Sequence, residues 1–423
     1  MERCYRYDVA VIGGGMAGTA AAIGAAAAGA QTVLVERNPY LGGIGTHSGV
    51  ASFCGFFTGE TTPHQIVGGV GQRVLEALAE IGEDITPERT MSGGYIINYD
   101  IEALKYVLDQ LVLKSRVKLL LEARAIRVPR EPDTVTEIEC IDDEGLFTVK
   151  ANAFVDATGD AAVAHMAGHP TEYGDESGNV QMATLEMRLG GVSRDLKAGT
   201  EDVERALHKA REEGYGPMTK MSAPIWFNKK GDIAALTLPN YALHALDTES
   251  LTRAAYETRE LARVYAHALR DFMPGMENSF LLSTGPRIGI RESRRVVCQK
   301  LLSFREALAG GKTESDTIGW AGWPIEMHDR LDTMSTNKSL EGGFCYGIPL
   351  GCLKAEELSN LWCAGRDIFA DHETLASVRV MGTGFVTGHA AGVAAALSGK
   401  EGSCDTEVIQ KIQKELVRQG AML

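Results

Sequence analysis

The stretch YDVAVIGGGMAGTAAAIGAAAAGAQTVLVERN, residues 7–38, decides how the rest of this 423-residue chain is interpreted. Its β-branched run Asp8–Ile12 predicts a buried parallel strand. Three glycines follow at once, in the spacing Gly13-x-Gly15-x-x-Gly18. The alanine-rich residues after them predict a closely packed helix, so the stretch indicates a strand, a tight turn and a helix in immediate succession.

Each part of this pattern has a physical role. The first glycine permits the tight turn, the second lets the backbone approach a diphosphate, and the third lets the helix pack on the strand. The helix, ending near Gly29, offers unpaired N–H groups and a positive dipole end to phosphates. Thr32–Val35 predicts a second strand that ends at Glu36, whose carboxylate can accept both ribose hydroxyls of an adenosine. An acid there favours a free 2′-hydroxyl, so the pattern predicts FAD or NAD rather than NADP.

The composition restricts the class of protein. Hydrophobic residues make up 44% and charged residues 23%, as in an ordinary soluble globular protein, and the length predicts two or three folding units or one interleaved pair. A formal net charge of -14 argues against non-specific binding of nucleic acid or of an anionic membrane. The eight cysteines show neither a CxxC pair nor a zinc-site spacing, and the N-terminus shows no apolar leader. We therefore expect a cytoplasmic protein with reduced thiols and no metal site.

The residues beyond Glu36 separate FAD from NAD. Gly42, Gly43 and Gly45 form a second glycine cluster, which a longer cofactor needs because backbone must pass close to its diphosphate and ribityl chain. A strand is predicted again at Ala153–Asp156, before Ala-Thr-Gly-Asp, and at Leu361–Ala364, before Gly-Arg-Asp. These late segments favour FAD.

Taken together, these segments resemble the glutathione-reductase-like FAD superfamily. Within it, the chain is most similar to the FAD-dependent oxidoreductases related to succinate dehydrogenase-type flavoproteins. The resemblance implies that Asp367 hydrogen-bonds the ribityl chain or the diphosphate, and that the backbone of Met381–Gly384 faces the flavin pyrimidine, where a helix N-terminus stabilises negative charge. The expected cofactor-binding residues are Gly13, Gly15, Met16, Ala17, Gly18, Glu36, Arg37, Gly42, Gly43, Gly45, Thr46, Ala125, Ala157, Thr158, Gly159, Asp160, Gly365, Arg366, Asp367, Met381, Gly382 and Gly384.

The fold class that follows is α/β, with a Rossmann-like FAD-binding domain and an inserted α+β substrate or cap domain. Short β-rich runs between residues 116 and 155 predict the β-meander common in the superfamily. We expect the FAD-binding domain at residues 1–48, 99–170 and 341–400, the cap domain at 49–98 and 171–340, and a C-terminal helix at 401–423.

The sequence shows no second GxGxxG between a strand and a helix, and no redox-active CxxC or CxxxxC. Pyridine-nucleotide disulfide reductases of the superfamily carry both. The reaction class predicted is therefore a different one, in which electrons come from the substrate, from a diffusing reductant or from a partner protein.

The densest basic cluster is GPRIGIRESRRVV, residues 285–297. Arg287 and Arg291 alternate as on one face of a strand, and a guanidinium fork suits a substrate carboxylate. Ion pairing with Glu292 is the alternative, and it weighs most for Arg294 and Arg295.

Further candidates lie in the cap and near the late helix. His328 and His372 are candidate general acids or bases, with a structural hydrogen-bonding role as the alternative for each. Arg379 is a candidate substrate clamp or a partner of the flavin O2 atom. His47 is expected over the isoalloxazine, and Tyr346 in the substrate pocket.

The leading hypothesis is an FAD-dependent oxidoreductase that moves a hydride between a small, carboxylate-bearing substrate and flavin N5. An oxidase or monooxygenase that uses O2, and an electron-carrying subunit of a larger complex, are the alternatives. The expected partner is a small-molecule substrate rather than nucleic acid or a membrane, with a homo-oligomer or a redox partner protein left open.

Overall fold

A seven-stranded sheet forms the centre of the larger part of the molecule. The computed structural model describes residues 3–228, 231–310, 315–331, 335–340, 345–399 and 401–423. The strand order is β6-β2-β1-β9-β8-β7, and β22 pairs with β9 as well. The bounds are β1 Arg3–Ile12, β2 Thr32–Val35, β6 Lys118–Leu120, β7 Arg124–Arg127, β8 Ile138–Asp142, β9 Gly145–Asp156 and β22 Leu361–Cys363.

The long strand β9 joins a parallel half and an antiparallel half of this sheet. It runs parallel to β1 over nearly all of that strand, and its last three residues pair in parallel with β22. Strand β8 pairs antiparallel with β9, and β7 pairs antiparallel with β8, so the three form a meander. Strand β6, inside the range predicted as meander, instead pairs in parallel with β2. It does so because a helical crossover, α4 (Ile101–Lys114), precedes it and returns the chain in the parallel direction.

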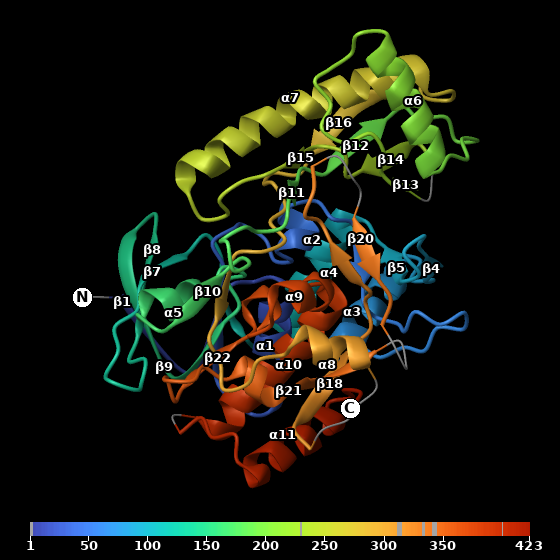
Figure 1. Ribbon diagram of the computed structural model, residues 1–423. Helices are drawn as coiled ribbons and strands as arrows, with labels where there is room; N and C mark the ends of the chain where they lie inside the picture. The colour runs from blue at the N-terminus through green and yellow to red at the C-terminus, as the bar shows by residue number, and fades with distance from the viewer. Residues whose placement is uncertain (1–2, 229–230, 311–314, 332–334, 341–344, 400) are drawn as a thin grey trace.

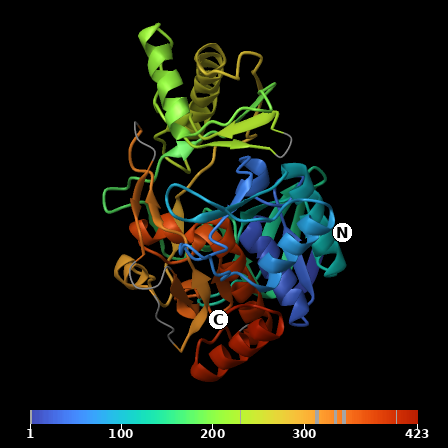
Figure 2. The same cartoon turned by 90° about the vertical axis from the view of Figure 1, so that its right-hand side faces the viewer.

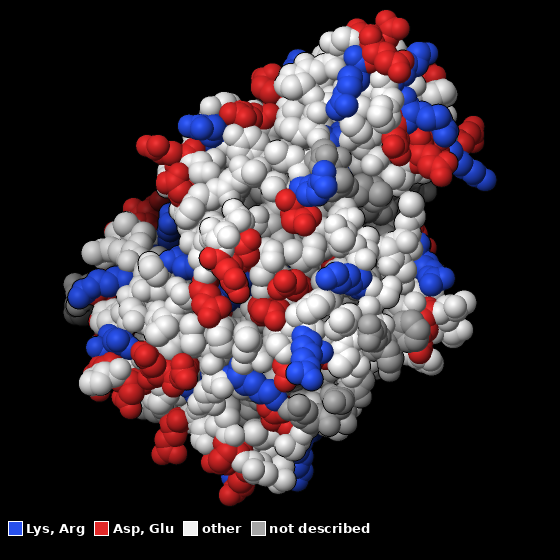
Figure 3. Space-filling model, in the orientation of Figure 1, with Lys and Arg blue, Asp and Glu red and all other residues white. Residues whose placement is uncertain are grey.

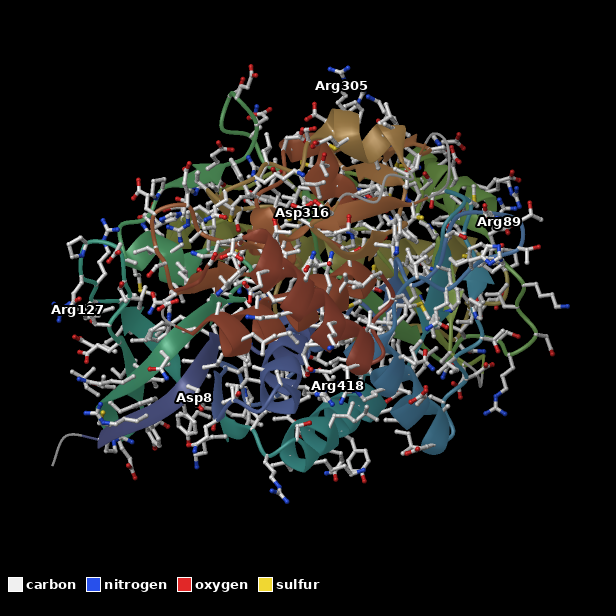
Figure 4. All side chains as sticks on the ribbon, turned by 90° about the horizontal axis from the view of Figure 1, so that it is seen from below. Asp8, Arg89, Arg127, Arg305, Asp316 and Arg418 are labelled. Carbon is white, nitrogen blue, oxygen red and sulfur yellow. The ribbon has the colours of Figure 1, made fainter. Side chains whose placement is uncertain are left out.

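Two apolar helices pack against each other unusually closely beneath this sheet. They are α1 (Met16–Ala27), from the opening motif, and α10 (Met381–Ser398), from near the end of the chain. A Cβ atom at Gly388 would lie 2.0 Å from Ala17 O, and one at Gly392 would lie 2.0 Å from Ala21 O. The absence of side chains at these two positions therefore allows the helix backbones to touch. Figure 4 shows α1 and α10 side by side, with Arg418 at the end of α1.

The C-terminal segment holds these two helices from outside. Helix α11 (Thr406–Arg418) ends where Arg418 donates to Ala27 O at 2.8 Å. The next residue, Gln419, donates to Gly24 O at 3.2 Å and pairs with His389 at 2.8 Å. The tail therefore ties the C-terminal end of α1 to the middle of α10.

A second unit stands above the first and has its own core (Figures 1 and 2). Its sheet has the order β13-β14-β12-β16, and two helices cover one face of it. The bounds are β12 Met187–Gly190, β13 Ile225–Phe227, β14 Ile233–Leu236, β16 Phe280–Thr284, α6 Thr200–Glu212 and α7 Thr248–Phe272. We call this the cap unit.

The remaining elements pack around the larger core or connect it to the cap unit. The paired strands are β3 Ser52–Cys54 and β4 Glu88–Arg89 with β5 Tyr95–Asn98, β10 Thr171–Tyr173 with β17 Arg294–Val296, β11 Ala183–Thr184 with β15 Asn240–Tyr241, β18 Thr317–Ala321 with β21 Tyr346–Pro349, and β19 Ile325–Met327 with β20 Thr336–Lys338. The helices are α2 Ile44–His47, α3 Gly69–Glu80, α5 Ala162–Met166, α8 Phe304–Ala309 and α9 His372–Val378, with 3₁₀ turns at Leu350–Leu353 (η1) and Gly365–Asp367 (η2).

The packing bears on the proposed domain division. The sequence predicts that residues 49–98 belong to the cap. In the structure, Phe53, Phe56 and the apolar face of α3 belong to the larger core. The rings of Phe53 and Phe56 both contact Phe385 of α10. Strand β18 belongs to the same core. This packing favours counting these segments with the FAD-binding domain, and the domain boundaries stay a proposal.

The helices were compared with the length and composition that a membrane-spanning helix needs. Among the described residues, no single helix is long and apolar enough to cross a bilayer; α9 and α10 pass that test only as a pair, bent by 95°. Most residues of α10 are buried inside the larger core. Acidic and basic side chains are interspersed over the face in Figure 3.

Candidate active site

A cavity of about 360 Å³ opens at the carboxyl ends of β1, β2, β9 and β22. Ligands of open parallel sheets bind at this edge, because the loops after the strands converge there. Most of the predicted cofactor-binding residues line it: Gly13, Gly15, Met16, Ala17, Glu36, Arg37, Gly43, Ala125, Ala157, Thr158, Gly159, Asp160, Gly365, Arg366, Met381 and Gly384. We call this the first cavity.

The three motif glycines have different surroundings. A Cβ at Gly13 would lie 2.3 Å from Ala157 O, and one at Gly18 would lie 1.7 Å from Gly13 O. Those two positions serve the packing of strand, loop and helix. At Gly15 the nearest atom, Gly43 Cα, is 3.8 Å away. Gly15 therefore presents bare backbone to open space, as a closely approaching diphosphate requires.

Glu36 is 5% exposed and is already partly hydrogen-bonded. It accepts from the Gly14 amide at 2.5 Å, and from the amide and the side chain of Asn38 at 2.8 and 2.5 Å. A carboxylate has about four acceptor positions, so about one remains. Glu36 can therefore accept a hydrogen bond from one ribose hydroxyl, whereas the sequence predicts that it accepts from two.

Positive charge gathers around one carboxylate in the first cavity. Asp160 pairs with Arg366 at 3.3 Å and faces Arg287 at 4.0 Å. Burial lowers the pKa of Arg287 to about 10, with a further lowering by Arg37 that Asp160 opposes. Burial alone would raise the pKa of Asp160, but Arg366 and Arg287 together lower it.

This excess of cations fits an anionic group. Within the described residues, the buried Nη1 of Arg366 has no hydrogen-bond partner. A buried guanidinium N–H without an acceptor is costly, and diphosphate oxygens would satisfy it. The first cavity therefore has the shape, bare backbone and charge that FAD requires.

Six predicted residues do not line the first cavity: Gly18, Gly42, Gly45, Thr46, Asp367 and Gly382. The Thr46 hydroxyl donates to Leu41 O at 2.6 Å, inside its own loop. A Cβ at Gly382 would lie 2.6 Å from Cys54 O, so this glycine serves packing. A direct contact of these six residues with the cofactor stays a prediction.

Asp367 is the most instructive of the six. It is fully buried, and its two oxygens accept from the amides of Gly159 and Ala161 at 2.9 and 2.8 Å. Burial and the nearby Asp156 raise its pKa well above the usual range. Asp367 thus holds the loop after β9 in place, and the cavity-facing residues of that loop are Thr158–Asp160.

Sequence reasoning missed other residues of the first cavity. Asn38, Ala123, Arg124, His165, Ile288 and Ile290 all line it. Arg124 directly precedes Ala125, a predicted cofactor contact, on β7. A basic side chain next to a predicted contact is the sequence signal that could have identified Arg124.

A second cavity, of about 540 Å³, lies beside the first. The two share Ile44, Arg379, Val380 and Met381, so they adjoin at the N-terminus of α10. The walls of the second cavity come from the β3-β5-β4 sheet, the cap unit and β19, which meet beneath the cap in Figure 1. Its apolar wall includes Trp226 and Trp323.

Three of the five predicted catalytic residues line this second cavity: Arg291, Arg379 and His328. Arg291 Nη1 donates to Met182 O at 2.5 Å and to Thr184 Oγ1 at 2.7 Å. Burial lowers the pKa of Arg291 to about 9, and Arg379 lowers it further. Arg379 Nη2 lies 3.4 Å from Glu326 O, and its buried Nε has no partner within the described residues.

The other two predicted catalytic residues lie elsewhere. Arg287 lines the first cavity and not the second, so its guanidinium faces the cofactor side. His372 lines neither; its Nδ1 pairs with buried Glu292 at 2.8 Å. Burial lowers the pKa of His372, but the hydrogen bond to Glu292 and the negative charges nearby, that of Glu292 foremost, together raise it. Glu292 therefore holds the His372 ring outside both cavities, and an acid–base role for His372 stays a prediction.

The remaining candidates divide in the same way. His47 lines the first cavity, and burial together with Arg287 lowers its pKa to about 4. Tyr346 was expected in the substrate pocket, but it does not line the second cavity. Its hydroxyl is buried and donates to Ser377 at 2.9 Å. Arg294 lines the first cavity, whereas Arg295 forms an ion pair with Glu292 at 2.7 Å.

Glu186 and Lys220 also line the second cavity, and sequence reasoning missed both. Glu186 alternates with apolar Leu185 and Met187, a pattern typical of a solvent-facing position on a strand. Lys220 lies outside any helix or strand. Within the described residues, no group of three or more metal-ligating side chains could hold a metal ion.

Comparison with known families supplies the identity that this geometry indicates. The model of the family described as FAD dependent oxidoreductase matches residues 8–416. The chain belongs to this family. Its cofactor is FAD, which the first cavity fits. The oxidoreductase has the mixed α/β architecture, with a parallel Rossmann-like sheet and added antiparallel sheets, that its sequence predicts.

Solved structures similar to this oxidoreductase are distant. A geranylgeranyl bacteriochlorophyll reductase-like protein from Thermoplasma acidophilum is 14% identical, with a TM-score of 0.46 over 99% of this chain and 85% of that one. The myxobacterial chondrochloren halogenase CndH is 13% identical, with a TM-score of 0.46 over 98% and 79%. The flavin-dependent brominase Bmp2 is 12% identical, with a TM-score of 0.48 over 96% and 83%. Likeness at this level carries no argument about the reaction.

Proposed function

We propose that this oxidoreductase transfers a hydride between flavin N5 and a small organic substrate that carries a carboxylate. The observation that carries the proposal is the second cavity, which adjoins the cofactor cavity at Arg379–Met381 and contains two arginines with hydrogen-bonding capacity to spare. A closer relation to succinate dehydrogenase-type flavoproteins, inferred from the sequence motifs, stays part of this proposal.

Arg291 and Arg379 are the proposed carboxylate clamp. Within the described residues, Nε and Nη2 of Arg291 make no hydrogen bond, and Nε of Arg379 makes none. Guanidinium groups bind carboxylates through paired N–H donors, and such bonds are strong where water is excluded. The apolar residues Trp226 and Trp323 suit the hydrophobic body of the same substrate.

The residues of the first cavity would hold FAD with its redox-active end toward the junction. The loops at Gly15 and Thr158–Asp160, with Arg366, suit the diphosphate, and the N-terminus of α10 at Met381 suits the flavin pyrimidine. When bound, FAD supplies the two-electron chemistry. The protein then orients the substrate, excludes water and neutralises its charge.

The test uses protein purified with FAD and a series of small carboxylates. We expect the flavin spectrum to shift on titration, and Arg291→Ala and Arg379→Ala to weaken binding about 10- to 100-fold while retaining FAD, since a hydrogen bond to a charged group contributes about 1.5–3 kcal/mol. Arg205→Ala is the matched control, because Arg205 lies on the exposed face of α6 and pairs with Asp202. Loss of FAD from the Arg291 variant would instead show that Arg291 is structural.

The same preparation separates the alternatives. Anaerobic bleaching of the flavin by a substrate supports the dehydrogenase or reductase reaction. Fast, substrate-dependent reoxidation by O2 would favour an oxidase or monooxygenase. A flavin spectrum that responds to no small molecule would favour an electron-carrying subunit.

A further inference from the structure

The second cavity contains a carboxylate, that of Glu186, which the binding of an anionic substrate does not explain. Glu186 is 5% exposed and lines this cavity. Within the described residues, its carboxylate makes no hydrogen bond and no ion pair within 4.0 Å. Its oxygens are not among the buried atoms that lack a partner, so they open into the cavity. A carboxylate that the described part of the protein leaves without partners is available to whatever occupies the cavity.

Glu292 shows what a structural carboxylate looks like in the same protein. It is also buried, but it accepts from the Gln181 amide at 3.1 Å and from Arg295 at 2.7 Å, and it pairs with His372. All its bonds are made by the protein. Glu186 differs because its carboxylate is left for whatever occupies the cavity.

The backbone holds Glu186 firmly in this orientation. Its carbonyl oxygen accepts from the Gly285 amide at 3.0 Å, and Leu185 and Met187 on either side are buried in the core of the cap unit. Because side chains alternate along an extended segment, Thr184 and Glu186 both face the cavity. Thr184 accepts from Arg291 at 2.7 Å, which puts Glu186 beside the proposed carboxylate clamp.

The charges that face Glu186 come from several elements. Burial raises the pKa of Glu186 to about 8, although Arg188, Arg291 and Lys220 favour its ionised form. Tyr99 faces it from the larger core. Burial lowers the pKa of Lys220 to about 8, and Arg291 lowers it further. Near neutral pH a carboxyl group in this position can both give and take a proton.

We propose that Glu186 is a catalytic acid–base residue, which faces the bound substrate and exchanges with it the proton that accompanies the two-electron transfer. The inference rests on the proposed function, because it needs a substrate in the second cavity. With FAD bound, reduction of the substrate would add a hydride from the reduced flavin and the proton of the Glu186 carboxyl group, which becomes a carboxylate. In the oxidation direction, the Glu186 carboxylate would take the proton and the oxidised flavin would take the hydride.

The first test observes the Glu186 proton directly and needs no substrate. In infrared difference spectra of the FAD-loaded protein between pH 6 and pH 10, we expect the wild type to lose a protonated-carboxyl band with a midpoint of about 8. Glu186→Gln should lack that band and retain FAD. Glu88→Gln is the matched control, because Glu88 lines the same cavity but is exposed, and it should keep the band. The same band in Glu186→Gln would overturn the proposal.

The second test asks whether this proton is coupled to a ligand, with phenylacetate as the probe and flavin absorbance as the readout. Deprotonation of Glu186 puts a negative charge beside the anion. The wild-type Kd should therefore rise between pH 7 and pH 9 by about tenfold more than the Kd of Glu186→Gln. The variant keeps only the pH dependence that comes from Lys220. Equal slopes in the two proteins would overturn the role of Glu186.

Failure of the proposed carboxylate site would look different. If phenylacetate and the other carboxylates perturb neither protein at any pH, the clamp formed by Arg291 and Arg379 is wrong. The infrared titration then decides on Glu186 alone: the midpoint near 8 keeps it as the proton-exchanging group of the cavity, and its absence removes it.

Discussion

At the scale of single residues, neighbouring positions of one motif serve different purposes. Gly18 has no space for a side chain, because a Cβ would overlap the Gly13 carbonyl. Gly15 has space on the protein side and faces the cavity. The consensus GxGxxG shows which residues are glycine, but the space around each one separates folding from cofactor binding.

This difference gives a paired prediction. Gly15→Val should fold but be purified without its yellow colour, because the new side chain occupies the path of the diphosphate. Gly18→Val should be unstable, since its side chain meets backbone. Flavin absorbance and thermal unfolding followed by circular dichroism check both. A Gly15→Val protein that retains full flavin would show that the diphosphate lies elsewhere.

Asp367 and His372 show why motif residues are hard to assign from sequence. The resemblance implies a cofactor contact for Asp367, and the sequence makes His372 a candidate acid or base, yet neither lines the first cavity. Their functional atoms are hydrogen-bonded instead to Gly159, Ala161 and Glu292. Glu292 is 80 positions from His372, so no local sequence pattern predicts this pairing.

At the scale of elements, the contact between α1 and α10 determines the shape of the cofactor cavity. Both helices begin at its edge, with Met16 and Ala17 from one and Met381 and Gly384 from the other. Their glycines and alanines gave a sequence signal for close packing. Which glycine touches which carbonyl depends on the register of two helices more than 350 residues apart.

The register leads to a prediction within one helix. Gly388→Ala should destabilise the flavin-stripped protein by about 1–3 kcal/mol, because its Cβ would lie 2.0 Å from Ala17 O. Gly384→Ala is the control, since the nearest atom to its Cβ is 3.8 Å away. Urea unfolding measures both. Equal stabilities of the two variants would contradict the close helix contact.

His389 predicts how this helix pair responds to acid. It is 2% exposed, and burial lowers its pKa to about 4 even though Gln419 accepts or donates a hydrogen bond. In the unfolded chain this histidine binds a proton near pH 6.5, whereas in the folded chain it stays neutral until about pH 4. The free energy of unfolding therefore falls as the pH drops below 6.5. Between pH 7 and pH 5 this contributes a loss of about 2 kcal/mol.

Replacement of His389 should remove this contribution. In urea titrations at pH 7 and pH 5, His389→Gln should lose about 2 kcal/mol less than the wild type. His64→Gln, at a side chain that is 72% exposed, should behave like the wild type. An unchanged pH dependence in His389→Gln would assign the acid sensitivity to other groups.

At the scale of the whole molecule, the proposed substrate cavity exists only because two cores meet. Its walls combine the β3-β5-β4 sheet and β19 with residues of the cap unit, including Trp226. The four tryptophans divide accordingly: Trp226 and Trp323 line the second cavity, and Trp320 and Trp362 do not.

The tryptophans make ligand binding visible without catalysis. A carboxylate ligand in the second cavity should change the tryptophan fluorescence of the wild type, and Trp226→Phe should reduce this change. Trp320→Phe should retain it. A signal that survives in Trp226→Phe and disappears in Trp320→Phe would place the ligand outside the second cavity.

The sequence by itself determined the cofactor, the parallel sheet and most of the residues that line the cavity at the edge of this sheet. These depend on local geometry: a strand, a glycine turn and a helix N-terminus lie within a few residues of one another and bind a diphosphate in a fixed way. Only the tertiary structure decided the second cavity, the separation of Arg287 from Arg291, and the exposure of the Glu186 carboxylate to a ligand. Those features depend on which distant segments supply hydrogen-bond partners and which leave a polar group without one. Contacts between distant segments produce no periodic pattern in the sequence, so the sequence does not predict them.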